Sequence, residues 1–98
     1  MASFVVETFL PQGNADRFSI DVVQVAAAVE AMAVVGGHVR HVRSYVVPSD
    51  EMGFHVLEAE SAEQVREITT RARIDVERIV EAIGVGPGGS TSGLEGRR

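Results

Sequence analysis

The sequence predicts an α+β domain of the ferredoxin-like βαββαβ type (an α/β plait), with a four-stranded antiparallel sheet and two helices on one face. Four short segments are rich in β-branched and aromatic residues, and two segments have helical character. They follow one another in the order strand, helix, strand, strand, helix, strand. At 98 residues the chain is long enough for one domain, predicted over residues 1–85. The Gly/Ser-rich residues 86–98 are expected to form a disordered tail.

The first segment, "SFVVETFLP", is predicted to be a strand because Phe4, Val5, Val6 and Phe9 are β-formers. Pro11 ends it, since proline cannot donate to a strand ladder. Apolar residues occupy both alternating sets, which favours a strand covered on both of its faces.

A helix is predicted over residues 19–35, an alanine-rich stretch that Gly36 and Gly37 terminate. Either Asp16 or Ser19 is expected to cap its N-terminus. The apolar spacing predicts an inner face that holds Ile20, Val23, Ala27 and Val34. The predicted solvent stripe holds Asp21, Gln24 and Ala28, while further valines and Met32 widen the apolar arc.

The segments "HVRHVRSYVVP" and "MGFHVLEAE" are predicted to form a hairpin, because only the polar turn "PSDE" separates them. "SAEQVREITTRAR" is predicted to be a helix, with Ser61 and Gln64 as a capping box and Glu67 and Arg71 as an i,i+4 pair. "DVERIVEAIGV" fits a helix or a strand, and the order of the other elements favours a strand.

Alternation along the hairpin predicts which side chains share a face. A turn centred near residues 49–50 places Ser44 opposite His55 and His41 opposite Glu58. The predicted open face holds His41, Arg43, Tyr45, Phe54, Val56 and Glu58. The predicted helix-covered face holds Val42, Ser44, Val46, His55, Leu57 and Ala59. His38 and His41 should therefore point to opposite sides of a regular strand, and they share no metal ion unless a bulge intervenes.

An open face with Tyr45, Phe54 and Val56 would expose an apolar patch, and such patches usually mark an interface. We therefore expect a homodimer that pairs two open sheet faces.

The composition limits the partners and the location. The chain carries nine arginines, no lysine and a net charge of −5, which argues against nucleic acid or anionic lipid as a partner. It has no cysteine, so disulfides and thiolate chemistry are excluded. No apolar run approaches the roughly 20 residues needed to span a bilayer, and no signal peptide is visible. We expect a cytoplasmic protein.

Three motifs in order, "FVVE…LP", "VRHVRSYV" and "FHVLEAESAEQVRE", resemble a family of small bacterial ferredoxin-like nickel-binding proteins, largely catalogued as a domain of unknown function. The resemblance spans about residues 3–85, and it implies a homodimer that binds a metal of the nickel type. Glu7, Ser44 and Tyr45 match the motif positions. Arg43 stands where family members often carry a histidine, and His55 stands where they often carry a cysteine.

The resemblance directs attention to one candidate site. Nickel, or another divalent transition metal, accepts nitrogen and oxygen ligands, and His41, His55 and Glu58 are the candidate ligands. The candidate pocket-lining residues are Glu7, Arg43, Ser44, Tyr45 and Phe54.

Structural roles compete with each of these assignments. His41 can simply pair with Glu58, and His55 can be a core histidine that Ser44 satisfies. Glu7 can form an ion pair with Arg43 or Arg78.

A second class of function uses the same residues. A histidine or glutamate beside Tyr45 could act as a general base in a cofactor-free enzyme of the isomerase or oxygenase kind. Alternatively, the protein could bind a small ligand in a pocket at the sheet face without catalysing a reaction. Metal binding without catalysis is the leading prediction.

Overall fold

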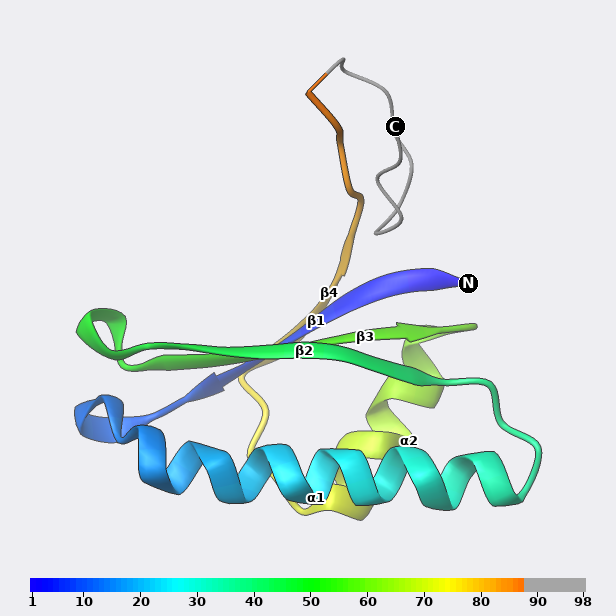
Figure 1. Ribbon diagram of the computed structural model, residues 1–98, viewed down its shortest axis with the longest axis horizontal. Coiled ribbons are helices and arrows are strands. Elements are labelled where there is room, and N and C mark those ends of the chain that lie inside the picture. The colour runs from blue at the N-terminus through cyan, green and yellow to red at the C-terminus, as the bar shows by residue number, and fades with distance from the viewer. Residues whose placement is uncertain (88–98) are drawn as a thin grey trace.

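The computed structural model describes residues 1–87, which form four strands, two helices and two short 3-10 turns. The elements are β1 (Ala2–Phe9), η1 (Pro11–Gly13), α1 (Ala15–Val34), β2 (Arg40–Val47), η2 (Pro48–Asp50), β3 (Met52–Ala59), α2 (Ala62–Ala72) and β4 (Arg78–Ala82). The sheet order is β2-β3-β1-β4 with every neighbouring pair antiparallel. Both helices lie on the same face of the sheet (Figure 1). The predicted ferredoxin-like α+β fold is confirmed.

The predicted tail, residues 86–98, lies outside the described residues except for its first two. The domain boundary at residue 85 therefore stays a prediction. No helix of residues 1–87 is long and apolar enough to cross a membrane.

The strands end where the sequence predicts. β1 stops before Pro11 and β2 stops before Pro48, because neither proline has an N–H to donate. The hairpin turn closes through Glu51, whose φ of 53° lies in the left-handed region and whose N–H donates to the Pro48 carbonyl. The ambiguous last segment is a strand.

Helix α1 begins at Ala15 rather than at Ser19, so the predicted start is wrong. The cap is Asn14, whose side-chain oxygen accepts a hydrogen bond of 3.1 Å from the Arg17 N–H, rather than Asp16 or Ser19. The earlier start places Phe18 inside the helix, where it is buried. Gly36 ends the helix with a φ of 88°, as the glycine pair predicts.

The predicted inner face of α1 is also wrong. Ile20, Val23 and Val34 are 59%, 67% and 85% exposed, and Ala27 is exposed too. Ala28, predicted to face solvent, is buried together with Phe18, Val25 and Met32. The helical period was right, but α1 carries apolar residues on two sides, and periodicity alone does not say which side faces the sheet.

Helix α2 starts with the predicted capping residues. The Ser61 hydroxyl accepts from the Gln64 N–H at 3.2 Å, and the Gln64 side chain accepts from the Glu60 N–H at 2.9 Å. The Glu67–Arg71 ion pair forms at 3.8 Å between exposed side chains, where it contributes little stability.

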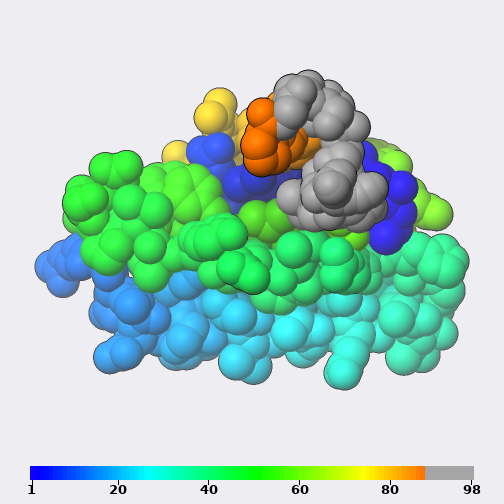
Figure 2. All heavy atoms as spheres, turned by 45° about the horizontal axis from the view of Figure 1, so that its top comes forward, coloured from blue at the N-terminus to red at the C-terminus, as the bar shows by residue number. Residues whose placement is uncertain are grey.

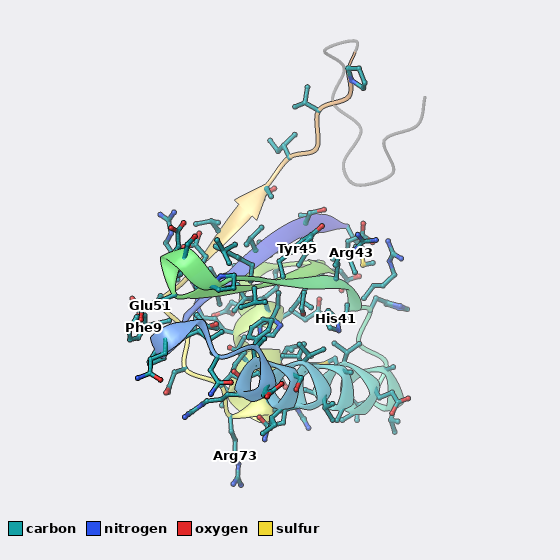
Figure 3. All side chains as sticks on the ribbon, turned by 60° about the vertical axis from the view of Figure 1, so that its left-hand side comes forward. Phe9, His41, Arg43, Tyr45, Glu51 and Arg73 are labelled. Carbon is teal, nitrogen blue, oxygen red and sulfur yellow. The ribbon has the colours of Figure 1, made fainter. Side chains whose placement is uncertain are left out.

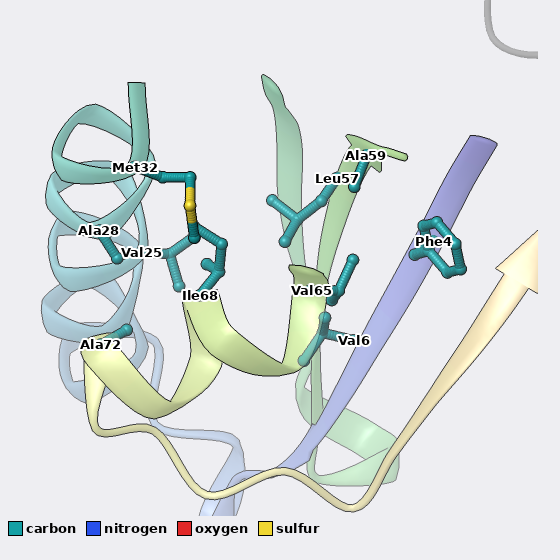
Figure 4. Packing of buried hydrophobic residues seen from close by; sticks show 10 residues of the cluster. All are labelled: Phe4, Val6, Val25, Ala28, Met32, Leu57, Ala59, Val65, Ile68 and Ala72. Atoms are coloured by element: carbon teal, nitrogen blue, oxygen red, sulfur yellow. The ribbon is translucent and has the colours of Figure 1, made fainter. Parts of the chain in front are cut away.

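The core lies between the sheet and the two helices (Figure 4). Its buried apolar members are Phe4, Val6, Val25, Ala28, Met32, Leu57, Ala59, Val65, Ile68 and Ala72. β3 supplies one alternating set to this core, because its burial alternates residue by residue. Within residues 1–87, the other face of the sheet carries no helix, and we call it the open face.

Gly53 offers a test of the packing between α1 and β3. A Cβ atom at Gly53 would lie 2.3 Å from Cε1 of Phe18, a buried ring. Gly53→Ala is therefore expected to lower the free energy of unfolding by about 1 to 3 kcal/mol, the usual cost of overpacking. The measurement is the urea midpoint, with Gly86→Ala as the control because a Cβ there meets nothing within 4 Å. Equal midpoints for the two variants would contradict this packing.

Candidate functional site

A β-bulge in the edge strand β2 decides which face His41 uses. Arg40 lies opposite Glu58, His41 opposite Leu57, and Arg43 opposite Val56, so Val42 is an extra residue in β2. A bulge shifts the alternation by one residue, and His41 consequently moves to the helix-covered face. The prediction that His41 lies opposite Glu58 and on the open face is wrong. The predicted pairing of Ser44 with His55 is confirmed.

The bulge brings His41 into a hydrogen-bonded chain with Ser44 and His55, which we call the His–Ser–His chain. Nε2 of His41 lies 2.8 Å from Oγ of Ser44, and the same oxygen lies 2.8 Å from Nδ1 of His55. The two imidazole centroids are 6.2 Å apart. His41 points from β2 toward α1, whereas Arg43 and Tyr45 point away from the helices (Figure 3).

His55 is the most deeply buried member of the chain, with 0% of its surface exposed. Phe18 of α1 stacks on its ring with 4.8 Å between centroids and 21° between planes. Nε2 of His55 is buried and has no hydrogen-bond partner within residues 1–87. Such an atom is unusual, because buried polar groups are nearly always paired.

The unpaired Nε2 of His55 indicates which imidazole nitrogens carry protons. Ser44 has one hydroxyl hydrogen, so it donates to one imidazole and accepts from the other. If Ser44 donates to His41 and accepts from Nδ1–H of His55, the orphan Nε2 carries only a lone pair. The reverse arrangement buries an unpaired N–H, which proteins rarely tolerate. The first arrangement is therefore the resting state that the geometry favours.

Both histidines are held toward their neutral forms. Burial, together with a smaller effect of the neighbouring His41, lowers the pKa of His55 to about 4. Burial also lowers the pKa of His41. A neutral imidazole has a lone pair for a hydrogen or a metal ion, which a protonated ring lacks.

The open face of the sheet holds the remaining predicted residues. Glu7, Tyr45 and Phe54 lie side by side across three strands. Glu7 pairs with Arg78 at 3.0 Å, which settles its partner in favour of Arg78 over Arg43.

Two further contacts complete this face. Glu58 pairs with Arg40 at 2.9 Å, and the Arg43 guanidinium lies 6.0 Å from the Tyr45 ring centroid.

The predicted ligands and pocket residues are therefore divided between the two faces. His41, Ser44 and His55 meet on the helix-covered face, and Glu58 lies on the open face. Within residues 1–87, no three His, Cys, Asp or Glu side chains are grouped so that they could hold a metal ion.

A cavity of about 360 Å³ lies elsewhere, between the end of β1, α1 and the segment after α2. Phe9, Arg17, Asp21, Arg73 and Asp75 are among its lining residues, and the predicted pocket residues are not. Burial raises the pKa of Asp21, which Arg17 opposes and Asp75 reinforces. The charges of the cavity wall are thus of both signs.

Sequence reasoning missed Phe18 as the residue that stacks on His55. It lies just before the predicted helix start at residue 19, although Asn14 is a favourable N-cap residue that is compatible with an earlier start. It also missed Arg40 as the partner of Glu58, which follows from the bulge.

The fold and this geometry define the class as a small ferredoxin-like α+β protein in which a buried histidine is linked through a serine to a half-buried one. A family model described as "nickel responsive protein SCO4226-like" matches residues 4–82, and the chain belongs to this family. The crystal structure of SCO4226 from Streptomyces coelicolor A3(2) has the same fold, with a TM-score of 0.68. It is 20% identical in sequence, and the match covers 83% of this chain and 95% of that one. No curated protein matches the chain.

The buried neutral His55 predicts a pH-dependent stability. Its pKa is about 4 in the folded chain, against 6.5 when unperturbed, so the unfolded chain takes up the proton first as pH falls. The free energy of unfolding is therefore highest above about pH 6.5 and falls as the pH drops toward 4. The loss is about 2 kcal/mol at pH 5. Urea unfolding of the wild type and of His55→Gln between pH 7 and 5 checks this. The difference between them should shrink as pH falls, and parallel curves would contradict the burial.

Proposed function

We propose that this protein binds a divalent metal ion of the nickel type through His41 and His55. Membership of a family described as nickel responsive supports the class of ion. The observation that carries the proposal is the convergence of two imidazole nitrogens on one hydroxyl oxygen, each at 2.8 Å.

The donor atoms fit a borderline metal in type. Imidazole nitrogen suits nickel, copper and zinc, and both rings are biased toward the neutral form that a metal requires. The Ser44 hydroxyl replaces the Glu58 carboxylate, which the sequence-based hypothesis had as the oxygen ligand. Glu58 has no part in this proposal, because it lies on the other face of the sheet and is held by Arg40.

The donors are fewer than nickel prefers, since its usual geometries are square-planar or octahedral. Water can complete the set on the side of His41, which is half-buried, whereas His55 is sealed from solvent. Metal binding also needs the lone pair on Nδ1 of His55, which moves the ring proton to the orphan Nε2. That proton has no acceptor within residues 1–87, so its cost weakens binding and favours reversible occupancy.

We further propose that the protein is a homodimer formed through its open sheet face. The centre of this face is apolar and half-buried in the single chain, with Val5, Phe54, Val56 and Val80 side by side and Tyr45 at 50% exposure. The ion pairs of Glu7 with Arg78 and of Arg40 with Glu58 supply charged groups around it. An apolar centre with a polar rim is the usual anatomy of an interface. The absence of cysteine is consistent with a cytoplasmic location.

Calorimetric titration of the metal-free protein with Ni²⁺ tests the metal proposal. Wild type should bind with measurable heat, and His41→Ala should weaken binding at least tenfold, because a nitrogen ligand is lost. His55→Gln should weaken it similarly. The matched control is His38→Ala, which removes the remaining histidine at an exposed position and should leave the affinity unchanged.

Two results would contradict the metal proposal. One is the absence of heat from wild type with Ni²⁺, Cu²⁺ or Zn²⁺. The other is an affinity that falls in His38→Ala as much as in His41→Ala, which would place the ion elsewhere.

The dimer has a separate test. Tyr45→Glu puts a charge on the apolar face and should shift the protein toward monomer in sedimentation equilibrium at micromolar concentration. Ser49→Glu is the control, since Ser49 is exposed at the hairpin tip and lies off this face. A monomeric wild type, or a Tyr45→Glu variant with unchanged mass, would rule out this interface.

A further inference from the structure

A groove runs along the helix layer between α1 and the C-terminal end of α2. It consists of two adjoining hollows of about 340 and 390 Å³. The first is lined by Gln24, Ala27, Ala28, Ala31, Arg71, Ala72 and Arg73. The second is lined by Arg17, Ile20, Asp21, Gln24 and Arg73. Because the two hollows share Gln24 and Arg73, they form one continuous depression, which we call the interhelical groove.

One side of α1 forms the long wall of the interhelical groove. Arg17, Ile20, Gln24, Ala27 and Ala31 recur at spacings of three and four, so they lie along one side of the helix. All five are exposed. From Arg17 to Ala31 this wall extends for about 21 Å at 1.5 Å per residue. In Figure 2, α1 is a continuous band along one side of the molecule, and its exposed wall is open to a partner.

The interhelical groove is positively charged in a chain that is acidic as a whole. The charged residues of its lining are Arg17, Asp21, Arg71 and Arg73. Three arginines against one aspartate leave the lining with a formal charge of +2, whereas the whole chain carries −5. Asp75 and Glu77 line the neighbouring cavity at the end of β1. The groove is therefore a local site of attraction for a negatively charged partner.

Two of the three arginines are not paired with a carboxylate. Arg17 and Arg73 form no ion pair within residues 1–87, although Arg17 lies near enough to Asp21 to oppose the rise in its pKa. Arg71 pairs with Glu67 at 3.8 Å, and both side chains are exposed, so this pair is weak. The groove thus offers three guanidinium groups to an acidic partner.

Arg73 adopts a backbone conformation that favours glycine. Its φ of 58° and ψ of 42° lie in the left-handed region at the end of α2, where its N–H donates to the Thr70 carbonyl at 3.2 Å. Helices usually end in this conformation with glycine, because a Cβ atom is strained there. The Arg73 side chain extends from the helix layer away from the sheet (Figure 3). Backbone strain of this kind clusters at functional sites, so a charged residue here points to a binding role for its guanidinium.

We propose that the interhelical groove binds an acidic, amphipathic helical segment of a partner protein. The apolar side chains of this segment pack on Ile20, Ala27 and Ala31, and its carboxylates pair with the three arginines. A helix of about 14 residues spans the length of the groove. An amphipathic helix in a groove is a common mode of recognition, and small alanine side chains let the incoming helix approach closely.

The same residues argue against three other occupants. A second copy would bring Arg71 and Arg73 toward the arginines of another groove, and like charges repel. Helices that lie on membranes carry Lys and Arg along their polar face, whereas α1 exposes Asp16 and Glu30. A small ligand would be left largely in solvent, because most of the lining residues are exposed, whereas small-molecule sites enclose their ligand.

A designed peptide tests the proposal. The probe is a fluorescein-labelled amphipathic helix with leucines at spacings of three and four and glutamates on its flanks. The control peptide carries lysine in place of every glutamate. Fluorescence anisotropy should show that the acidic peptide binds at least tenfold more tightly than the lysine peptide, and that its affinity falls as salt is added. No binding of the acidic peptide, or equal binding of the two, would overturn the proposal.

Variants of Arg73 separate binding from folding. Arg73→Gln should lower the affinity for the acidic peptide at least fivefold. The matched control is Arg66→Gln, which changes an exposed arginine of α2 that lines a different hollow and should leave the affinity unchanged. Arg73→Gly should lose the same affinity while its urea midpoint rises, because glycine relieves the strained backbone. Wild-type affinity in both Arg73 variants, or an equal loss in Arg66→Gln, would overturn the proposal.

Two further measurements distinguish the other occupants. Co-sedimentation with phosphatidylserine vesicles that is lost in Arg73→Gln would assign the groove to a lipid surface. Self-association in sedimentation equilibrium that is lost in the same variant would assign it to a second copy of the chain. We expect neither result, and either would overturn the proposal.

Discussion

One extra residue in the edge strand β2 determines which face of the sheet each polar side chain of the hairpin uses. Because Val42 is the bulge, His41 faces the helices and meets the Ser44 hydroxyl at 2.8 Å, while Arg40 turns to Glu58 on the open face. In a regular strand without the bulge, His41 would lie on the open face instead. The hairpin therefore carries the His–Ser–His chain on its helix-covered face and the ion pair of Arg40 with Glu58 on its open face.

The His–Ser–His chain is held in place by packing as well as by hydrogen bonds. Gly53 has no Cβ, which leaves room for the ring of Phe18, and that ring stacks on His55. The Ser44 hydroxyl then connects His55 to His41 at the strand edge. Helix α1 and the hairpin are linked through these contacts, so the position of His55, one of the two proposed metal ligands, depends on helix packing. Partly satisfied polar networks of this kind are costly, and the orphan nitrogen marks where that cost is concentrated.

The sequence predicted the elements well because their signals are local. Prolines and glycines bounded the strands and the first helix, and Ser61 with Gln64 marked the start of α2. Two features were not predictable in the same way. The bulge at Val42 depends on pairing with β3, and no residue type announces it. The orientation of α1 depends on which of its two apolar stripes meets the sheet. The sequence is equally compatible with the stripe that contains Ala28 and the stripe that contains Ala27. The first error misplaced His41, and the second placed the exposed Ile20, Val23 and Val34 in the core.

The central claim is that His41 and His55 are joined through one hydroxyl inside the protein. Proton NMR of the imidazole rings in the metal-free protein tests it most directly. The account predicts that His55 titrates with a midpoint near pH 4 and shows nuclear Overhauser contacts to the rings of Phe18 and His41. A midpoint near the unperturbed value of about 6.5 for His55, without a contact to His41, would contradict it.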